Sequence, residues 1–347
     1  MSSNKKIDQW ISSRKKRLES FKADELYPLL LKGDKQALSS AITLIESTHP
    51  NARAESSKLV ELCSREKSKS WRIGITGVPG VGKSTFIEAF GSQILNAGHK
   101  LAVLAVDPSS NVTGGSILGD KTRMNTLSQE DNAFIRPTAA AGNLGGVARN
   151  SREAMLLCET AGFDVIFIET VGVGQSETMV HSMVDYFVLL LLAGAGDELQ
   201  GMKRGIMELA DTILITKADT GNEKASKLAA RAYANAVHLF PSKESNWITN
   251  VLTTSSLDGM GLDETWDSVQ SYFNSIVSNG FYIQNRRQQN ARFLRENLTD
   301  LMLNEFDQDP ELKKYMNQLE NELTKGKLSP GRAVDLLFEQ YKTFLRG

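Results

Sequence analysis

The chain of 347 residues is 41% hydrophobic and 23% charged, which is the composition of an ordinary globular protein. Its formal net charge of −1 gives no electrostatic reason to expect nucleic acid or an anionic membrane as a partner. The two cysteines, Cys63 and Cys158, have no metal-ligand spacing and are too few for a disulfide framework. Since the N-terminus does not resemble a signal peptide and no apolar run is long enough to cross a bilayer, we expect a cytoplasmic protein.

The first 68 residues are expected to form a helical extension. Amphipathic runs at residues 7–22, 35–47 and 52–63 have the spacing of helices, and Gly33-Asp34 separates the first two.

Residues 69–268 have a different pattern, in which short apolar strands alternate with helical stretches. The strands are expected at residues 73–76, 101–106, 165–169, 187–192, 212–215 and 251–254. Near-continuous aliphatic strands of this kind are typical of a parallel sheet that helices cover on both faces. The sequence therefore predicts an α/β fold with a mainly parallel sheet and helical extensions at both ends.

From residue 269 the pattern is helical again. Asp309-Pro310 and Ser329-Pro330 each have the form of an N-cap followed by proline at the first helical position. The two helices that follow carry apolar stripes, which either cover the sheet domain or pack against a second copy of the chain. We favour the second interpretation and expect residues 269–347 to be a dimerisation arm in a homodimer.

A glycine-rich loop follows the first expected strand and leads into a helix. It reads Gly77, Val78, Pro79, Gly80, Val81, Gly82, Lys83, Ser84 and Thr85, which is the P-loop of nucleoside triphosphatases in the context that it requires. Its backbone N–H groups and the helix dipole would face phosphate oxygens. Lys83 would reach the β- and γ-phosphates, and the Ser84 hydroxyl would bind Mg²⁺. Val78 stands where partitioning-type ATPases carry a lysine, which argues against that branch.

The segment from Thr216 to Asp219 (TKAD) follows another apolar strand. The carboxylate of Asp219 can accept two hydrogen bonds from guanine, whereas adenine offers no such donors in that arrangement. The aliphatic stem of Lys217 would lie along the ring, and Thr216 stands where the more familiar form of this motif has Asn. The bound nucleotide is therefore expected to be GTP or GDP.

The segment ETVGVGQSE directly follows the strand that ends at residue 168. A carboxylate at the tip of such a strand is suited to hold the Mg²⁺ shell, which is the role expected for Glu169. Gly172 would approach the γ-phosphate through its backbone N–H, making this loop a switch. Gln175 either orients an attacking water or is an ordinary loop residue.

A third polar loop runs from residue 105 to residue 124. Asp107 ends a strand. It could join the metal shell, accept a proton from water, or serve as an N-cap or turn carboxylate before Pro108. Asp120, Lys121 and Arg123 follow two glycine-bearing turns. They suit a mobile loop that closes on phosphate, or else the solvated start of a helix.

Taken in order, these motifs resemble the MeaB/ArgK-type GTPases. The resemblance is carried by GVPGVGKST, VDPSS, TGGSILGDKTRM, NLGGVA, ETVGVGQSE, GAGDELQGMKRGIMELAD and TKAD, followed by Trp247 and Trp266. It departs at residues 138–141, where a more polar stretch is expected. The resemblance implies a Mg²⁺-dependent GTPase that acts as a chaperone of an adenosylcobalamin-dependent acyl-CoA mutase, and that gates or protects the loading of its cofactor.

The resemblance also implies further site residues. The glycine-hinged loop at residues 194–206, with Asp197, Glu198 and Lys203, would be a third switch that senses the nucleotide and touches the mutase. Ser255 lies where a backbone amide contacts the guanine carbonyl in such proteins. Two alternatives stay open: an ATP-dependent kinase, which is the older label of this family, and a metallochaperone GTPase, against which the sparse Cys and His residues argue.

Overall fold

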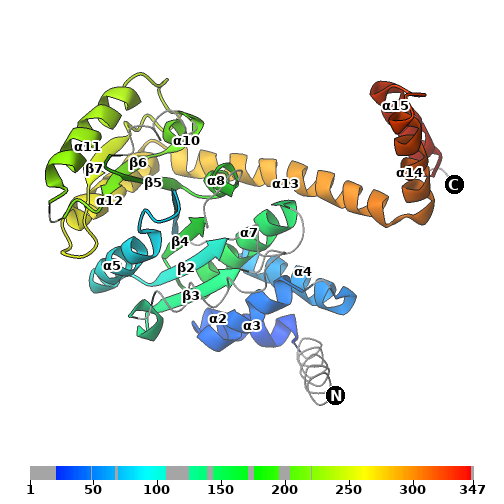
Figure 1. Ribbon diagram of the computed structural model, residues 1–347. Helices are drawn as coiled ribbons and strands as arrows, with labels where there is room; N and C mark the ends of the chain where they lie inside the picture. The colour runs from blue at the N-terminus through cyan, green and yellow to red at the C-terminus, as the bar shows by residue number, and fades with distance from the viewer. Residues whose placement is uncertain are drawn as a thin grey trace, which may run out of the picture. The chain divides into compact units, whose positions relative to one another are not determined.

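The computed structural model describes residues 21–47, 49–66, 69–106, 124, 126–138, 144–170, 176–194, 204–219 and 221–344. Within these residues, seven strands form one sheet in the order β3-β2-β4-β1-β5-β6-β7, and every neighbouring pair is parallel (Figure 1). The strands are β1 Trp71–Gly77, β2 Leu101–Val106, β3 Ala133–Thr138, β4 Val165–Thr170, β5 Tyr186–Leu192, β6 Thr212–Thr216 and β7 Asn250–Thr253. Because all of them run the same way, their carboxyl ends meet at one edge of the sheet, with β1 between β4 and β5.

The predicted α/β class and the six predicted strands are confirmed, and the structure adds β3. Among the described strands, β3 pairs only with β2, and it lies at one end of the sheet. It contains Arg136 and Pro137, and proline, which has no N–H to donate, is tolerated in a strand at the sheet edge. The strand was not predicted because Arg136 and Pro137 interrupt its run of apolar residues.

Helices cover both faces of the sheet. On one face, α5 and α12 pack against strand side chains such as Ile75, Val103 and Phe167. On the other face, α7 and α8 cover β2, β4 and β5, and α10 and α11 continue this layer over β5 and β6. Alternate residues of each strand supply the two layers. The bounds are α5 Lys83–Asn96, η1 Leu127–Gln129, α7 Leu144–Thr160, α8 Ser176–His181, α10 Arg204–Leu209, α11 Glu223–Val237 and α12 Leu262–Ser278.

The N-terminal helices belong to the same core as the sheet. They are α2 Ala23–Leu31, α3 Lys35–Ile45 and α4 Pro50–Ser64, and they lie against α7 (Figure 1). Leu38 and Leu59 share one buried cluster with Leu104 of β2. Arg136 of β3 also donates to Thr43 Oγ1 of α3 (3.2 Å) and to Oε2 of Glu46, the residue directly after α3 (2.7 Å). The expected division at residue 68 therefore does not separate two cores; α2, with Pro28 inside it, was not predicted.

The boundary expected after residue 268 lies inside α12. Residues of this helix that follow the boundary, Val269, Tyr272, Phe273 and Ile276, are buried in the core against the sheet. The first compact unit accordingly extends to Gln289, and the second comprises residues 290–347. The apolar face of α12 explains the difference, because removing it from the sheet would expose four large side chains.

The second compact unit is helical, as predicted. It contains the later part of α13 (Phe281–Gln308), together with α14 (Pro310–Thr324) and α15 (Pro330–Phe344). Asp309 caps α14 by accepting hydrogen bonds from Glu311 N and Leu312 N, and Ser329 Oγ accepts from Arg332 N at the start of α15. The helices α14 and α15 contact each other and bury Leu312, Leu319 and Tyr341. Among the described residues, no helix has the length and hydrophobicity needed to cross a membrane.

A buried charge network closes the amino-terminal edge of the sheet. Arg286 of α13 donates to both carboxylate oxygens of Asp185, at 2.6 Å each, directly before β5. Arg72 of β1 pairs with both oxygens of Glu159 at the end of α7, at 2.8 and 3.0 Å. Arg286 also donates to Glu159 (3.2 Å) and to Ser70 O (3.1 Å), so one helix holds the starts of both β1 and β5.

The network shifts the pKa values of its members. Burial alone would raise the pKa of Glu159, but the charges of Arg72 and Arg286, with hydrogen bonds from Arg72 and Ser70, lower it to about 2. Burial alone would lower the pKa of Arg286, but Asp185 and Glu159 raise it. Burial is the main cause that raises the pKa of Tyr282, beside Arg286, to about 12. These groups are therefore held in one charge state throughout the physiological pH range.

Candidate nucleotide-binding site

The phosphate loop lies at the carboxyl end of the central strand. β1 ends at Gly77 and α5 begins at Lys83, so five residues connect strand and helix. A Cβ atom added to Gly77 would lie 2.6 Å from Leu190 O of β5, so only glycine fits there. Gly82 has φ +100°, in the left-handed region that other residues rarely adopt. The two glycines let the backbone turn sharply between sheet and helix, as the P-loop motif predicted.

Lys83 folds back over this loop. Its Nζ donates to Gly77 O (2.8 Å) and to Val78 O (3.3 Å). A glycine occupies the N-cap position of α5, so no side chain competes for the first N–H groups of the helix. The loop thus gathers a lysine ammonium and the positive end of a helix dipole, which is an arrangement suited to binding an anion.

The TKAD segment is hydrogen-bonded directly to the phosphate loop. Thr216 Oγ1, at the end of β6, donates to Val81 O (2.8 Å) and to Leu191 O (3.2 Å). Lys217 has a left-handed backbone with φ +55°, and its Nζ donates to Gly80 O (2.9 Å). Two motifs that are more than 130 residues apart in the chain therefore form one site, because β5 alone separates β1 from β6.

Asp219 is positioned from a second loop. Its Oδ2 accepts a hydrogen bond from the buried Ser255 hydroxyl at 2.9 Å. Ser255 N donates to Met260 O (2.9 Å), within the same loop. The hydroxyl of Ser255 thus constrains the orientation of the Asp219 carboxylate.

Asn222 is a residue that the sequence analysis missed. Its Nδ2 donates to Lys217 O (2.9 Å), and its backbone N–H donates to Asp219 O (2.9 Å). Asn222 directly precedes α11, so the helix start is tied to the TKAD segment. An Asn just before an amphipathic helix was the available signal, since this residue type is common at helix starts.

Glu169 stands at the same edge of the sheet. It is the fifth residue of β4, and its Cα pairs with Ile75 of β1 and with Ala105 of β2. The residue is 4% exposed. Next to it, Thr170 Oγ1 donates to Thr76 Oγ1 at 2.9 Å, which links the two strand ends. A buried carboxylate is thereby held one strand away from the strand that leads into the phosphate loop.

The comparisons with known proteins agree with this geometry. A family model described as Methylmalonyl Co-A mutase-associated GTPase MeaB matches residues 38–311. The chain belongs to this MeaB family.

Relatives of known name support the assignment to the MeaB family. The chain is 44% identical to GTPase ArgK of Escherichia coli over 314 residues, covering 90% of this chain and 95% of that protein. It is 43% identical to the mitochondrial methylmalonic aciduria type A homolog of Mus musculus over 330 residues, covering 92% and 80%. A crystal structure of an LAO/AO transport system kinase is similar with a TM-score of 0.76 and 37% identity, over 92% of this chain and 97% of that one. Like its relatives that are named GTPases, this MeaB-family chain is a GTPase that binds guanine nucleotides.

Several residues expected at the MeaB-family site lie outside the described residues. They belong to the three loops expected to switch and are Asp107, Asp120, Lys121, Arg123, Gly172, Gln175, Asp197, Glu198 and Lys203. Among the expected site residues that the structure describes, Thr216 and Lys217 are hydrogen-bonded to the phosphate loop, and Lys83 is hydrogen-bonded to Gly77 within that loop. Ser84 and Thr85 lie in the first turn of α5.

Proposed function

We propose that this GTPase uses Mg²⁺-dependent hydrolysis of GTP to gate the loading, or the protection, of the cofactor of an adenosylcobalamin-dependent acyl-CoA mutase. The description of the family model names a mutase-associated GTPase, and the mouse relative is named for methylmalonic aciduria. The single structural observation that supports the proposal best is the pair of hydrogen bonds from Thr216 and Lys217 to the phosphate loop. These bonds connect the segment proposed to read the base with the loop proposed to bind the phosphates.

In this proposal, each end of the nucleotide has its own residues. Lys83 and the N–H groups of residues 77–85 hold the phosphates. Asp219 accepts two hydrogen bonds from guanine, with its orientation set by Ser255, and the stem of Lys217 lies along the ring. ATP would leave the acceptors of Asp219 without donors, which favours GTP.

Mg²⁺ would be held by Ser84, Glu169 and Asp107. Ser84 lies in the first turn of α5, and Glu169 is a buried carboxylate on the strand next to β1, so both supply the oxygen ligands that Mg²⁺ prefers. The metal would neutralise charge on the β- and γ-phosphates during hydrolysis. Gly172 would approach the γ-phosphate, and Gln175 would orient the attacking water.

The mutase would contact the loop at residues 194–206, with Asp197, Glu198 and Lys203, and would respond to loop 107–124, with Asp120, Lys121 and Arg123. A change in these loops between GTP and GDP would alter the affinity for the partner enzyme. The two buried free cysteines are in keeping with activity in a reducing cytoplasm.

We also propose that the chain is a homodimer whose contact lies in the second compact unit. Large apolar side chains of this unit are exposed: Leu294, Leu298, Leu301, Met302, Leu303, Val334 and Phe338. Such a stripe commonly packs against its copy. In analytical ultracentrifugation, Val334→Glu with Phe338→Glu should shift the full chain towards monomer, and an unchanged mass would argue against the arm.

The experiment that tests the proposed function is the GTPase rate with and without each of several purified adenosylcobalamin-dependent acyl-CoA mutases. A true partner should raise the rate and should bind with an affinity that differs between GDP and a non-hydrolysable GTP analogue. Removal of Mg²⁺ with EDTA should abolish hydrolysis, and readdition should restore it. If no mutase alters either rate or affinity, the proposed role is wrong, although the GTPase itself would stand.

The name of the similar crystal structure, a transport system kinase, raises a second candidate function. A kinase would transfer the γ-phosphate to an acceptor, whereas a GTPase releases it to water. Radiolabelled γ-phosphate recovered only as inorganic phosphate, in the presence of the mutase, would argue against the kinase.

A further inference from the structure

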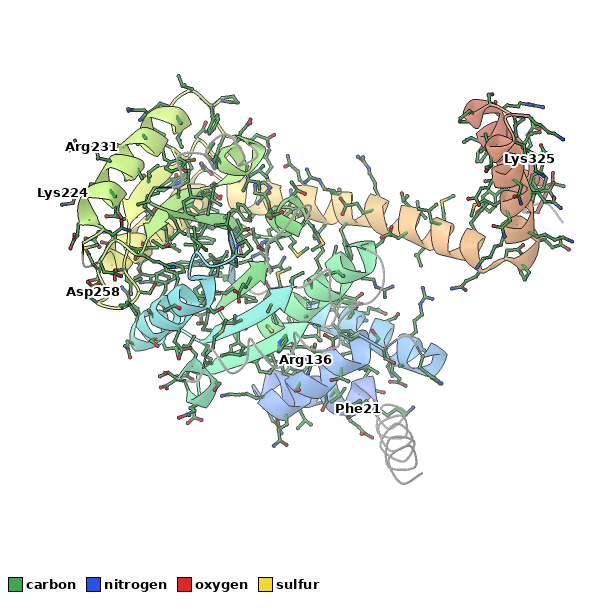
Figure 2. The ribbon with its side chains drawn as sticks, in the orientation of Figure 1. Phe21, Arg136, Lys224, Arg231, Asp258 and Lys325 are labelled. Carbon is green, nitrogen blue, oxygen red and sulfur yellow. The ribbon has the colours of Figure 1, made fainter. Side chains whose placement is uncertain are left out.

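The outward face of α11 is basic, and none of its side chains takes part in the nucleotide site described above. Lys224, Lys227 and Arg231 are exposed and are spaced i, i+3 and i+7, so they lie on one side of the helix. Figure 2 shows Lys224 and Arg231 at the outer side of α11, away from the sheet. Within the described part of the chain, these three cations form no ion pair with an acidic side chain.

Apolar side chains border the same face. Leu228 lies one turn after Lys224 and is 66% exposed. Leu239, just after the end of α11, is 79% exposed. The only acidic residue of the helix is Glu223, in its first turn. A surface of three cations beside two exposed leucines is complementary to an acidic segment that carries apolar side chains.

The buried side of α11 connects this face to the loop proposed to contact the mutase. Tyr233 and Val237 of α11 share one buried cluster with Met207 of α10. The helix α10 directly follows residues 194–203, and both helices cover the same face of β5 and β6. A partner enzyme that reaches α10 would therefore find α11 in the same layer of helices.

The start of α11 is also tied to base recognition. Asn222 N donates to Asp219 O and Asn222 Nδ2 donates to Lys217 O, both at 2.9 Å. A displacement of α11 on partner binding would therefore shift Lys217 and Asp219, the two residues proposed to hold guanine. The helix thus lies between an exposed docking face and the nucleotide.

We propose that the partner enzyme binds a second contact surface, the α11 face formed by Lys224, Lys227, Leu228, Arg231 and Leu239. The segment of the enzyme that binds there is acidic and carries apolar side chains that pack against the leucines. The inference rests on the proposed function. A protein partner is favoured over a polyanion because exposed leucines border the cations and because the whole chain carries a net charge of −1. The cations would accelerate encounter, and the leucines would be buried in the complex.

The test measures the affinity of the GDP-loaded and GTP-analogue-loaded full-length protein for the mutase that stimulates its GTPase activity, by calorimetry at two salt concentrations. Lys224→Glu with Arg231→Glu reverses two charges of the face. The matched control, Lys32→Glu with Arg53→Glu, makes the same change of net charge on exposed residues of the N-terminal helices.

The double reversal on α11 should weaken mutase binding about 10-fold or more, and should flatten its salt dependence, while intrinsic GTP hydrolysis stays unchanged. The control should stay within about 2-fold of the wild type. Leu228→Ser should weaken binding without changing the salt dependence, which separates the apolar contact from the charges.

Three outcomes would overturn the inference. If the wild type binds and is stimulated but the α11 reversal binds equally well, the docking face is wrong and the proposed function stands. If no mutase binds the wild type, both fail together. If the reversal instead abolishes binding to duplex DNA or to phosphatidylserine vesicles and leaves the mutase affinity unchanged, the face serves a polyanion.

Discussion

The two edges of the sheet are built from similar residue types and differ in how their charges are used. At the carboxyl edge, Lys83 and Lys217 donate to backbone oxygens of the loop that they border, at 2.8 to 3.3 Å. At the amino edge, Arg72 and Arg286 are paired with buried carboxylates at 2.6 to 3.2 Å. Among the described residues, Lys217 makes no ion pair with an acidic side chain, whereas the charges of Arg72 and Arg286 are compensated by buried carboxylates.

This difference indicates that the carboxyl edge of the sheet serves nucleotide binding and that the amino edge contributes to stability. Shifted pKa values often mark active sites, but here the lowered pKa of Glu159 and the raised pKa of Tyr282 belong to the edge that anchors α13. The nucleotide edge is recognised by its glycine conformations and by its hydrogen bonds between distant motifs. Substitutions at the two edges should therefore separate activity from stability.

The largest expected effect is that of Lys83→Ala at the carboxyl edge. Loss of the cation proposed to hold the phosphates should lower kcat for GTP about 1,000-fold, because such charge stabilisation acts mainly in the transition state. The free energy of unfolding should change little. Lys100→Ala, an exposed lysine before β2 at the opposite edge, is the control and should keep full activity. Steady-state hydrolysis and urea denaturation measure the two quantities, and an active Lys83→Ala protein would refute the assignment of the phosphate loop.

The reverse pattern is expected for Arg286→Met at the amino edge. Removal of the guanidinium leaves Asp185 and Glu159 buried with less positive charge, which should lower the free energy of unfolding by about 3–5 kcal/mol. Arg287→Met, at the exposed neighbouring position, should stay within about 0.5 kcal/mol of the wild type. Equal stability of the two variants in urea would show that the network does not anchor α13.

The pH dependence of stability tests the same network without a large structural change. The pKa of Glu159 in the folded protein, about 2, lies below its ordinary value of 4.5. A carboxylate with a lowered pKa stabilises the fold above its unfolded pKa, and this contribution is lost as the pH falls from about 4.5 towards 2. The loss should be on the order of 3 kcal/mol.

Glu159→Gln should be less stable than the wild type at pH 7 and should lose less stability between pH 4.5 and pH 2.5. Urea denaturation across this range provides the comparison. Parallel pH profiles for wild type and variant would mean that Arg72 and Arg286 do not hold the carboxylate in its charged form.

A smaller effect is expected for Asp219→Asn, which changes base preference and leaves the phosphate loop intact. GTP affinity should fall about 10- to 100-fold, because each lost hydrogen bond to a charged acceptor is worth about 1.5–3 kcal/mol and part of it is replaced by water. Affinity for XTP should rise, since the amide can pair with the xanthine ring. Glu223→Gln, an exposed acid nearby, is the control. Unchanged preference between GTP and XTP would remove the base-reading role from Asp219.

Much of the carboxyl edge of the sheet could be predicted because each of its motifs is a short continuous stretch of sequence. The P-loop and TKAD are each read within a few residues, and strand ends in a parallel sheet share one edge. The hydrogen bond from the Ser255 hydroxyl to Asp219 was not predictable, since it depends on how a distant loop folds back towards the TKAD segment. The network of Arg72, Glu159 and Arg286 was also missed, because its members are separated by more than 80 residues and each alone resembles a surface charge.

The local sequence pattern also did not predict where the compact units begin and end. Leu38 in the N-terminal helices and Val269 in α12 pack on the sheet core, although the helical texture around them suggested separate extensions. Amphipathic periodicity identifies the buried face of a helix but not the surface that covers it.

The most direct test of the guanine site is a calorimetric titration of the wild-type protein with GTP and with ATP, both with Mg²⁺. If Asp219, hydrogen-bonded to Ser255, reads the base as proposed, its acceptors are satisfied by guanine and not by adenine, and GTP should bind at least about 100-fold more tightly. Equal affinities for GTP and ATP would contradict the assignment of base recognition to the carboxyl edge.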